Sequence, residues 1–277
     1  MGAETTAVQS PARRSSSAGQ RWKPLMPWAT KLAFVALVLA VWQLLGGRGT
    51  LSSVPTASGC LSALAELVGD GSMWSPLGET MKAWSVGLAL SAAIAIPIGF
   101  LLGASSLAYR MTRLIIDFCR TIPALALLPL AVLLYGSGLG STLLLTVFAC
   151  VWPIMLQTIY GVRDIDAVVR ETCRSYRVNR WQWRWRVVLP SAGPYIATGL
   201  RIAAAISLLL VLSTEILIPV PGIGQAIMVA QLGGAVSEMY AWIVLAGLVG
   251  IAINAVLVRL ERTVLHWHPS QRKAARP

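Results

Sequence analysis

The feature that most limits how this chain can fold is a run of 42 consecutive residues, 121–162, without a single Asp, Glu, Lys or Arg. As one continuous helix such a run would be about 63 Å long, roughly twice the hydrocarbon thickness of a bilayer. The only turn-like stretch within it is the glycine-rich segment 136–140. The run therefore predicts two membrane spans, at about Thr121–Tyr135 and Ser141–Tyr160.

Four further apolar stretches are long enough to cross a membrane, at about Trp28–Gly47, Trp84–Gly103, Ala192–Leu217 and Met239–Val258. Composition agrees, because 56% of the residues are hydrophobic and only 12% are charged, about half the charged fraction of a typical soluble chain. A soluble fold could not cover its core with so little polar surface. We predict an all-α integral membrane protein with six transmembrane helices and both termini on the same side.

The basic residues indicate which side that is. With the N-terminus inside, 20 of the 23 Lys and Arg residues fall in cytoplasmic segments. The exceptions are Arg48, which would lie outside, and Lys82 and Arg201, which would lie within spans. Because Lys and Arg concentrate in cytoplasmic loops, we predict cytoplasmic N- and C-termini. The same bias explains most of the net charge of +12 without a nucleic-acid partner.

Four regions follow from this layout. Residues 1–23 are rich in Ser, Ala and Arg without hydrophobic periodicity, and we expect a disordered cytoplasmic tail. Residues 24–79 would hold the first span and an external loop long enough for a short helix lying on the membrane. Residues 80–268 would form the core, and residues 269–277 a second cytoplasmic tail.

Signatures of catalysis are missing from the sequence. The four cysteines form no C-x-x-C pair, and the two histidines lie in the polar C-terminal tail, so neither set predicts a metal site. None of the four lysines follows a glycine, which excludes a P-loop. No convergent nucleophile and base point to an intramembrane enzyme. We expect no catalytic residue and no cofactor in this chain, and any ATP would be bound by another subunit.

The loop between the fourth and fifth spans, residues 163–186, carries the strongest functional signal. Its apolar residues recur at helical spacing: Ile165, Val169, Cys173 and Tyr176. A second short helix is predicted through Trp181, Trp183 and Trp185, ending at Pro190. One interpretation is an amphipathic segment on anionic lipid headgroups. Stacking of the tryptophans on nucleic acid is disfavoured by the position between two spans.

This loop resembles the signature motif of the permease subunits of bacterial ABC importers. The family pattern is Glu-Ala-Ala, three residues, Gly, nine residues, Ile or Val, any residue, then Leu-Pro. The present sequence matches that spacing without a gap, through Glu171, Thr172 and Cys173, then Arg177, then Val187, Val188, Leu189 and Pro190. The resemblance extends over residues 80–268, and is strongest to the permeases for sulfonate, taurine and nitrate, a branch that includes carriers of thiamine-pyrimidine precursors.

The resemblance implies a six-helix permease of the type I importer kind in the bacterial inner membrane. It implies that residues 164–186 form a coupling helix that seats in a cytoplasmic ATPase, which would hold ATP and Mg²⁺. The coupling residues carried over from the motif are Glu171, Thr172, Cys173, Arg174, Arg177, Leu189 and Pro190. It also implies a second permease copy, contact with membrane lipids, and an external binding protein that delivers a small polar or anionic solute of sulfonate, taurine, nitrate or thiamine-pyrimidine-precursor type.

Two points about the motif residues stay open, the partner of Glu171 and the backbone conformation of Arg177. Glu171 would anchor the ATPase or the arginines of its own helix, and the alternative is an ordinary pair with Arg174, worth tenths of a kcal/mol. Thr172 and Cys173 replace the two alanines and are still small. Arg177 replaces the glycine, so it must either adopt a costly backbone conformation or extend the first helix.

Glu215 is the one acidic residue deep within a predicted span. An ionisable group in the membrane is a candidate for the translocation pathway, and the alternative is a structural pair or a water-facing group near the outer end. An ion-coupled secondary transporter using Glu215 or Lys82 is the competing function, although such proteins more often show repeated halves with interrupted spans. Arg201 lies nearer the cytoplasmic end, where it would snorkel or pair with a neighbour.

Overall fold

The computed structural model describes residues 27–47 and 54–265, and every regular element in these ranges is helical. The predicted tails at 1–23 and 269–277 lie outside the described residues. The helices are α1 (Pro27–Gly47), α2 (Ala57–Gly69), α3 (Trp74–Ala104), α4 (Ser106–Cys119), η1 (Ala124–Leu127), α5 (Leu128–Tyr135), α6 (Leu139–Arg163), α7 (Ala167–Ser175), α8 (Arg180–Gln182), η2 (Trp183–Val188), α9 (Leu189–Leu217), α10 (Ile223–Leu232) and α11 (Val236–Val264).

The centre of the bundle is built on close contact between α3 and α6. A Cβ atom on Gly87 would lie 2.7 Å from Thr146 Cγ2, and one on Gly99 would lie 2.7 Å from Thr158 Cβ. Glycine at these positions lets the two backbones approach, as small residues do in membrane helix pairs. The partners advance together along both helices, so α3 and α6 run parallel.

Because α3 and α6 are parallel, the segment that connects the end of α3 to the start of α6 must run back along the bundle. Helices α4 and η1–α5 form a pair bent by 78°. Because α6 begins beside the first half of α3 and ends beside its last turn, the bent pair must carry the chain back across the bundle as one broken span. The described residues therefore hold five helices long and apolar enough to span a membrane, and six candidate spans, the predicted number, if the bent pair counts as one; the third begins at Ser106 and not at about Thr121. Fifteen residues make only about 22 Å of helix, and Pro123, in an extended conformation, interrupts the turns.

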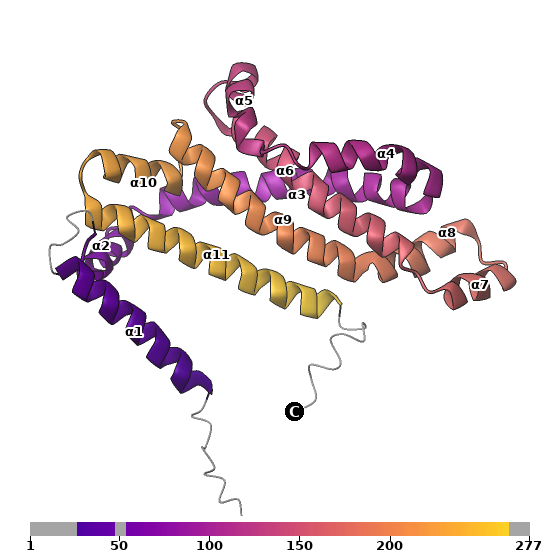
Figure 1. The fold of residues 1–277 in the computed structure, drawn as a ribbon, viewed down its shortest axis with the longest axis horizontal. Coiled ribbons are helices and arrows are strands. Elements are labelled where there is room, and N and C mark those ends of the chain that lie inside the picture. The colour runs from indigo at the N-terminus through magenta and orange to yellow at the C-terminus, as the bar shows by residue number, and fades with distance from the viewer. Residues whose placement is uncertain (1–26, 48–53, 266–277) are drawn as a thin grey trace, which may run out of the picture.

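Helices α9 and α11 complete the bundle in alternating directions. Gly161 of α6 lies against Ala192 near the start of α9, whereas Gly199 of α9 lies against Ile154. These two contacts make α6 and α9 antiparallel. Figure 1 shows α3, α6, α9 and α11 along the length of the molecule, with α7 and α8 at one end, here named the α7 end, and α10 at the other, the α10 end.

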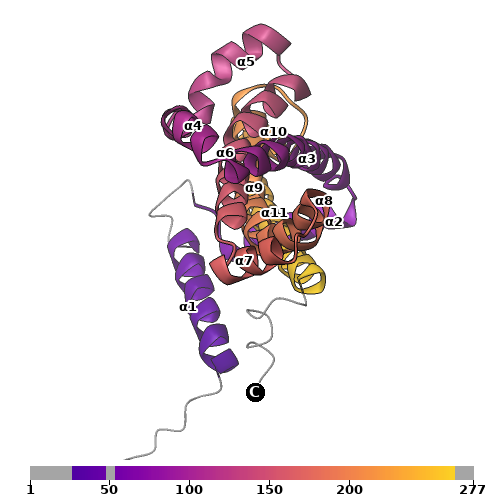
Figure 2. The same ribbon diagram turned by 90° about the vertical axis from the view of Figure 1, so that its right-hand side faces the viewer.

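The first span, α1, stands apart from this bundle, as Figure 2 shows. None of its most apolar stretch, Thr30–Gly47, is buried. Its last turns are tied at the α10 end, where Trp42 donates from its indole nitrogen to the Pro55 carbonyl at 3.1 Å and its ring lies 6.2 Å from that of Tyr240. The short helix expected in the following loop is α2.

Two boundaries differ from the sequence expectations. Helix α3 begins at Trp74, ten residues before the predicted start, and so includes Glu79 and Lys82, which pair one turn apart at 3.6 Å with both side chains half-exposed. The helix of the fifth span begins at Arg180 and runs without interruption to Leu217. Pro190 therefore does not end a separate second helix, and that prediction was wrong.

Candidate coupling segment and polar contacts of the bundle

The predicted coupling helix at 164–186 is in fact α7, a turn, and the helical residues α8 and η2 that lead into α9; these residues, 164–188, form the coupling segment, and both of its ends are held by the flanking spans. Ile165 at its start is buried with Val162 of α6, and both belong to a cluster with Val188 and Ala192 from the junction of η2 and α9. The Asp166 side chain accepts from the Val168 backbone N–H at 2.8 Å and caps α7. The segment is thus fixed at its base by apolar burial.

The outer part of α7 presents apolar side chains that nothing in the described chain covers. Of the predicted apolar face, only Ile165 points into the bundle. Val169 is 41% exposed, Tyr176 is 81% exposed, and the neighbouring Val168 is 68% exposed. Cys173 is partly buried. This exposed apolar strip beside charged residues has the character of a docking surface.

Glu171 and Arg174 are both exposed on α7. No ion pair joins them, nor does Glu171 pair with any other described cation within 4 Å. The Thr172 hydroxyl is turned back onto its own helix, where it donates to the Val168 carbonyl at 2.8 Å. The intrahelical alternative for Glu171 is therefore not formed, and its carboxylate is available to a partner.

Arg177, at the motif glycine, was expected either to adopt a costly backbone conformation or to extend the first helix, and the structure shows the first. Its φ is +49°, which makes it the one non-glycine residue with positive φ in the described chain. The Arg177 N–H donates to the Arg174 carbonyl at 3.1 Å and the Val178 N–H to the Cys173 carbonyl at 3.0 Å. These two bonds are the Schellman arrangement that ends a helix and favours glycine. The tight turn is kept, and arginine adopts the costlier conformation.

The passage into α9 shows how Pro190 is accommodated. Residues Trp183–Val188 form a π-helical segment, and the Leu189 N–H bonds the Arg184 carbonyl five residues back. The wider turn makes room before a proline that lacks an N–H and would clash with the carbonyl four residues earlier. Leu189 and Pro190 are the first residues of α9, so the motif's Leu-Pro pair marks where the coupling segment becomes a span.

The three tryptophans of this passage divide between two sides. Trp181 and Trp185 pack together with ring centroids 5.3 Å apart, and they are 65% and 53% exposed. Trp183 turns inward against the cluster of Val162 and Val188. The alternation seen in the sequence therefore separates one buried anchor from an exposed aromatic pair.

Glu215 lies at the α10 end, far along α9 from the coupling segment, and is only 1% exposed. Both of its carboxylate oxygens accept from the Thr80 hydroxyl, at 2.9 and 3.0 Å, and Oε2 also accepts from the Gly224 backbone N–H at 2.8 Å. Thr80 in turn accepts from the Ile223 N–H at 2.9 Å. A carboxylate at the first turn of α10 satisfies helix N–H groups that otherwise lack partners.

Close approach of the backbone completes this contact. A Cβ atom on Gly222 would lie 2.2 Å from Glu215 Cδ, and one on Gly224 would lie 2.4 Å from the Leu212 carbonyl oxygen. Sequence inspection identified Glu215 but missed Thr80, its partner 135 residues away. No local signal could have indicated that pair, because it depends on the packing of three separate helices.

Two other polar contacts bear on the predictions. Arg201 of α9 forms an ion pair with Glu261 of α11, so it pairs with a neighbour, one of the two expected outcomes. Tyr195 of α9 donates from its hydroxyl to the carboxylate of Asp164, at the base of the coupling segment. Tyr195 was not among the predicted site residues.

Comparison with known proteins identifies the architecture. Residues 95–265 match the family described as binding-protein-dependent transport system inner membrane component. An aliphatic sulfonates transport permease of Bacillus subtilis is 30% identical over 88% of this chain and 89% of its own length. A nitrate import permease of Synechocystis is 29% identical over 86% and 89%.

Among solved structures, an inward-facing form of the MetNI methionine ABC transporter shares the fold, with a TM-score of 0.60, 21% identity, and coverage of 67% of this chain and 93% of the matched chain. From the motif, the bundle and the family match together, this chain belongs to the binding-protein-dependent transport system inner membrane components, the multi-pass permeases of ABC importers.

Proposed function

We propose that this permease forms the pore of an ATP-driven importer and that its coupling segment transmits the motion of a separate ATPase to the spans. The observation that carries the proposal is the form of that segment. It is a short helix with exposed Val168, Val169 and Tyr176, whose base is buried between the ends of α6 and α9. A rigid element tied to two spans can pass on a displacement, whereas a disordered loop would absorb it.

The residues carried over from the motif take distinct parts in this proposal. Glu171 and Arg174 project from α7 as unpaired charges that the ATPase would meet. Thr172 and Cys173 keep the helix surface low enough for close contact, and Arg177 holds the turn that reverses the chain. Leu189 and Pro190 join the segment to α9. ATP and Mg²⁺ would be held entirely by the ATPase.

The transported solute is proposed to be small and polar or anionic. The named relatives act on sulfonates and nitrate, which share a compact oxyanion. An external binding protein would deliver the solute, and a second copy of the permease would complete the pore, with homodimerisation as the simplest arrangement. For Glu215 we propose a structural role, because its carboxylate is enclosed by Thr80 and Gly224 and is not exposed to a pathway within one subunit.

The proposal is tested by uptake in vesicles that contain the permease, its ATPase and its binding protein. Uptake should require ATP and all three components. Glu171→Ala should lower ATP-driven uptake by at least about tenfold, because an interfacial carboxylate with charged partners is worth on the order of 2 kcal/mol or more. Uptake that persists without the ATPase and follows an ion gradient would instead establish a secondary transporter.

The matched control is Glu66→Ala, the same change at an exposed glutamate of α2 near the opposite end of the bundle. It should leave uptake unchanged. Normal uptake by the Glu171 variant, with the permease present at ordinary levels in the membrane, would remove Glu171 from the coupling contact.

A further inference from the structure

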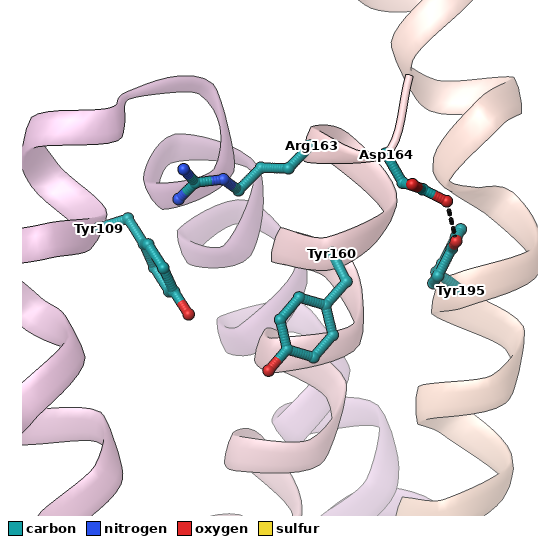
Figure 3. Close-up of a pocket in the computed structure, with 5 residues that line it drawn as sticks. All are labelled: Tyr109, Tyr160, Arg163, Asp164 and Tyr195. Carbon is teal, nitrogen blue, oxygen red and sulfur yellow. Dashed lines mark hydrogen bonds between the residues drawn. The ribbon is translucent and has the colours of Figure 1, made fainter. Parts of the chain in front are cut away.

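A pocket of about 430 Å³ lies at the α7 end, beside the base of the coupling segment. Three helices supply its walls, as Figure 3 shows: Tyr109 from α4, Tyr160 and Arg163 from α6, and Tyr195 from α9, with Asp164 just after α6. Its volume falls in the range of small-ligand sites. Neither the coupling proposal nor the Glu215 contact uses Tyr109, Tyr160 or Arg163.

Among the residues of this pocket, Arg163 carries the charged group with the fewest polar contacts. Its guanidinium carbon lies 4.5 Å from the centre of the Tyr109 ring, a cation–π contact that leaves the edges of the guanidinium open. In the ranges that the structure describes, no carboxylate lies within 4 Å of it. A planar set of N–H donors beside an aromatic face suits a phosphate or sulfonate oxyanion.

The negative group of the pocket is turned away from that position. In Figure 3 the Arg163 side chain extends toward Tyr109, whereas the Asp164 carboxylate extends to the opposite side and accepts from the Tyr195 hydroxyl. The Tyr160 ring lies between these two sides. An anion bound at Arg163 would therefore meet the ring of Tyr109 before it met a carboxylate.

We propose that this pocket is a binding site for an oxyanion of the phosphate or sulfonate type, with Arg163 as its principal ligand. Two sources supply this chemistry at a membrane surface, the headgroup of a phospholipid and a free anion in the aqueous phase. Asp164 joins α6 to α7, so occupation of the site would bear on the position of the coupling segment. Only that consequence rests on the proposed coupling function, and binding itself does not.

The test uses the full-length permease purified in detergent. Native mass spectrometry measures how much phosphatidylglycerol the protein retains, and calorimetric titration with inorganic phosphate and with methanesulfonate measures binding of free anions. Arg163→Gln should lower the affinity for whichever probe binds by at least tenfold. The control is Arg113→Gln on α4, where the arginine pairs with Asp117 outside the pocket.

The two arms separate the sources. Retention of phosphatidylglycerol that free phosphate does not displace supports a lipid headgroup, and saturable binding of phosphate or methanesulfonate to lipid-free protein supports a free anion. The proposal is overturned if the native protein binds no probe better than the Arg163 variant, or if Arg113→Gln weakens binding as much as Arg163→Gln does. Because the readout is binding and not transport, a failure here leaves the coupling proposal standing.

Discussion

At the scale of single residues, Arg177 shows what one departure from a family pattern does to a backbone. The Schellman bonds of Arg177 and Val178 require a left-handed residue where the helix ends, and the chain keeps those bonds with an arginine at φ +49°. A side chain in this conformation costs about 1 kcal/mol relative to glycine. The geometry of the turn has therefore been retained although its preferred residue has been lost.

Arg177→Gly should stabilise α7 by about that amount, because glycine reaches positive φ without steric cost. Amide hydrogen exchange over residues 167–178 would then slow by about fivefold. The control is Arg177→Ala, which removes the same charge but keeps the Cβ atom, and it should give no such protection. Equal slowing in both variants would mean that the charge of Arg177, and not its backbone, weakens the helix.

At the scale of elements, the first turn of α10 is held to α3 and α9 by one hydroxyl group, that of Thr80. The Thr80 hydroxyl of α3 donates to Glu215 of α9 and accepts from the Ile223 N–H at the start of α10. Removing it would leave a buried carboxylate and a buried N–H without this partner. An unsatisfied buried polar group costs about 1–3 kcal/mol.

Thr80→Val keeps the shape of the side chain and removes the hydroxyl, so α10 should open more readily. Amide exchange over residues 223–232 should speed up at least about fivefold. Thr214→Val is the matched control, since that buried hydroxyl bonds only to carbonyls of its own helix, those of Leu210 and Val211. If the control opened α10 as much, the effect would come from the substitution of a buried threonine in general.

The elements themselves were predictable to different degrees. The spans α6 and α11 were found close to their observed limits, since a long uncharged segment is a property of the local sequence. The third span was expected at about Thr121–Tyr135, whereas the structure has a bent pair of helices that begins at Ser106 and is interrupted at Pro123. Continuation of the fifth span back to Arg180 was missed, since a π-helical turn that accommodates Pro190 leaves no clear mark in the sequence.

At the scale of the whole molecule, the alternating directions of the packed helices place the ends of the chain relative to one another. The last turns of α1 lie at the α10 end, where the Trp42 ring contacts that of Tyr240. Helix α11 runs from that end toward the α7 end. In Figure 1, α1 traced back to its first described residue and α11 traced to its last both extend away from the α10 end. Since the seven arginines of residues 163–186 and Arg259 and Arg262 near the close of α11 lie at the α7 end, we expect that end to be cytoplasmic.

Cysteine labelling tests this orientation. In a permease whose partly exposed native cysteines, Cys119 and Cys173, are replaced by serine, Ser137→Cys and Ser175→Cys introduce one exposed thiol near each end of the bundle. A thiol reagent that cannot cross the membrane should label position 137 in intact cells and position 175 only after permeabilisation. The reverse pattern would show that the assigned orientation is inverted.

The sequence by itself determined that this chain spans a membrane about six times, which end carries most of the positive charge, and where the coupling motif lies. These properties depend on hydropathy, charge and spacing, which act along the chain. Only the tertiary structure decided that Arg177 keeps the turn, that Glu215 joins three helices through Thr80, and that Arg163 stands beside an open pocket. Those outcomes depend on which residues packing brings together from distant positions, and no local preference encodes a partner 135 residues away.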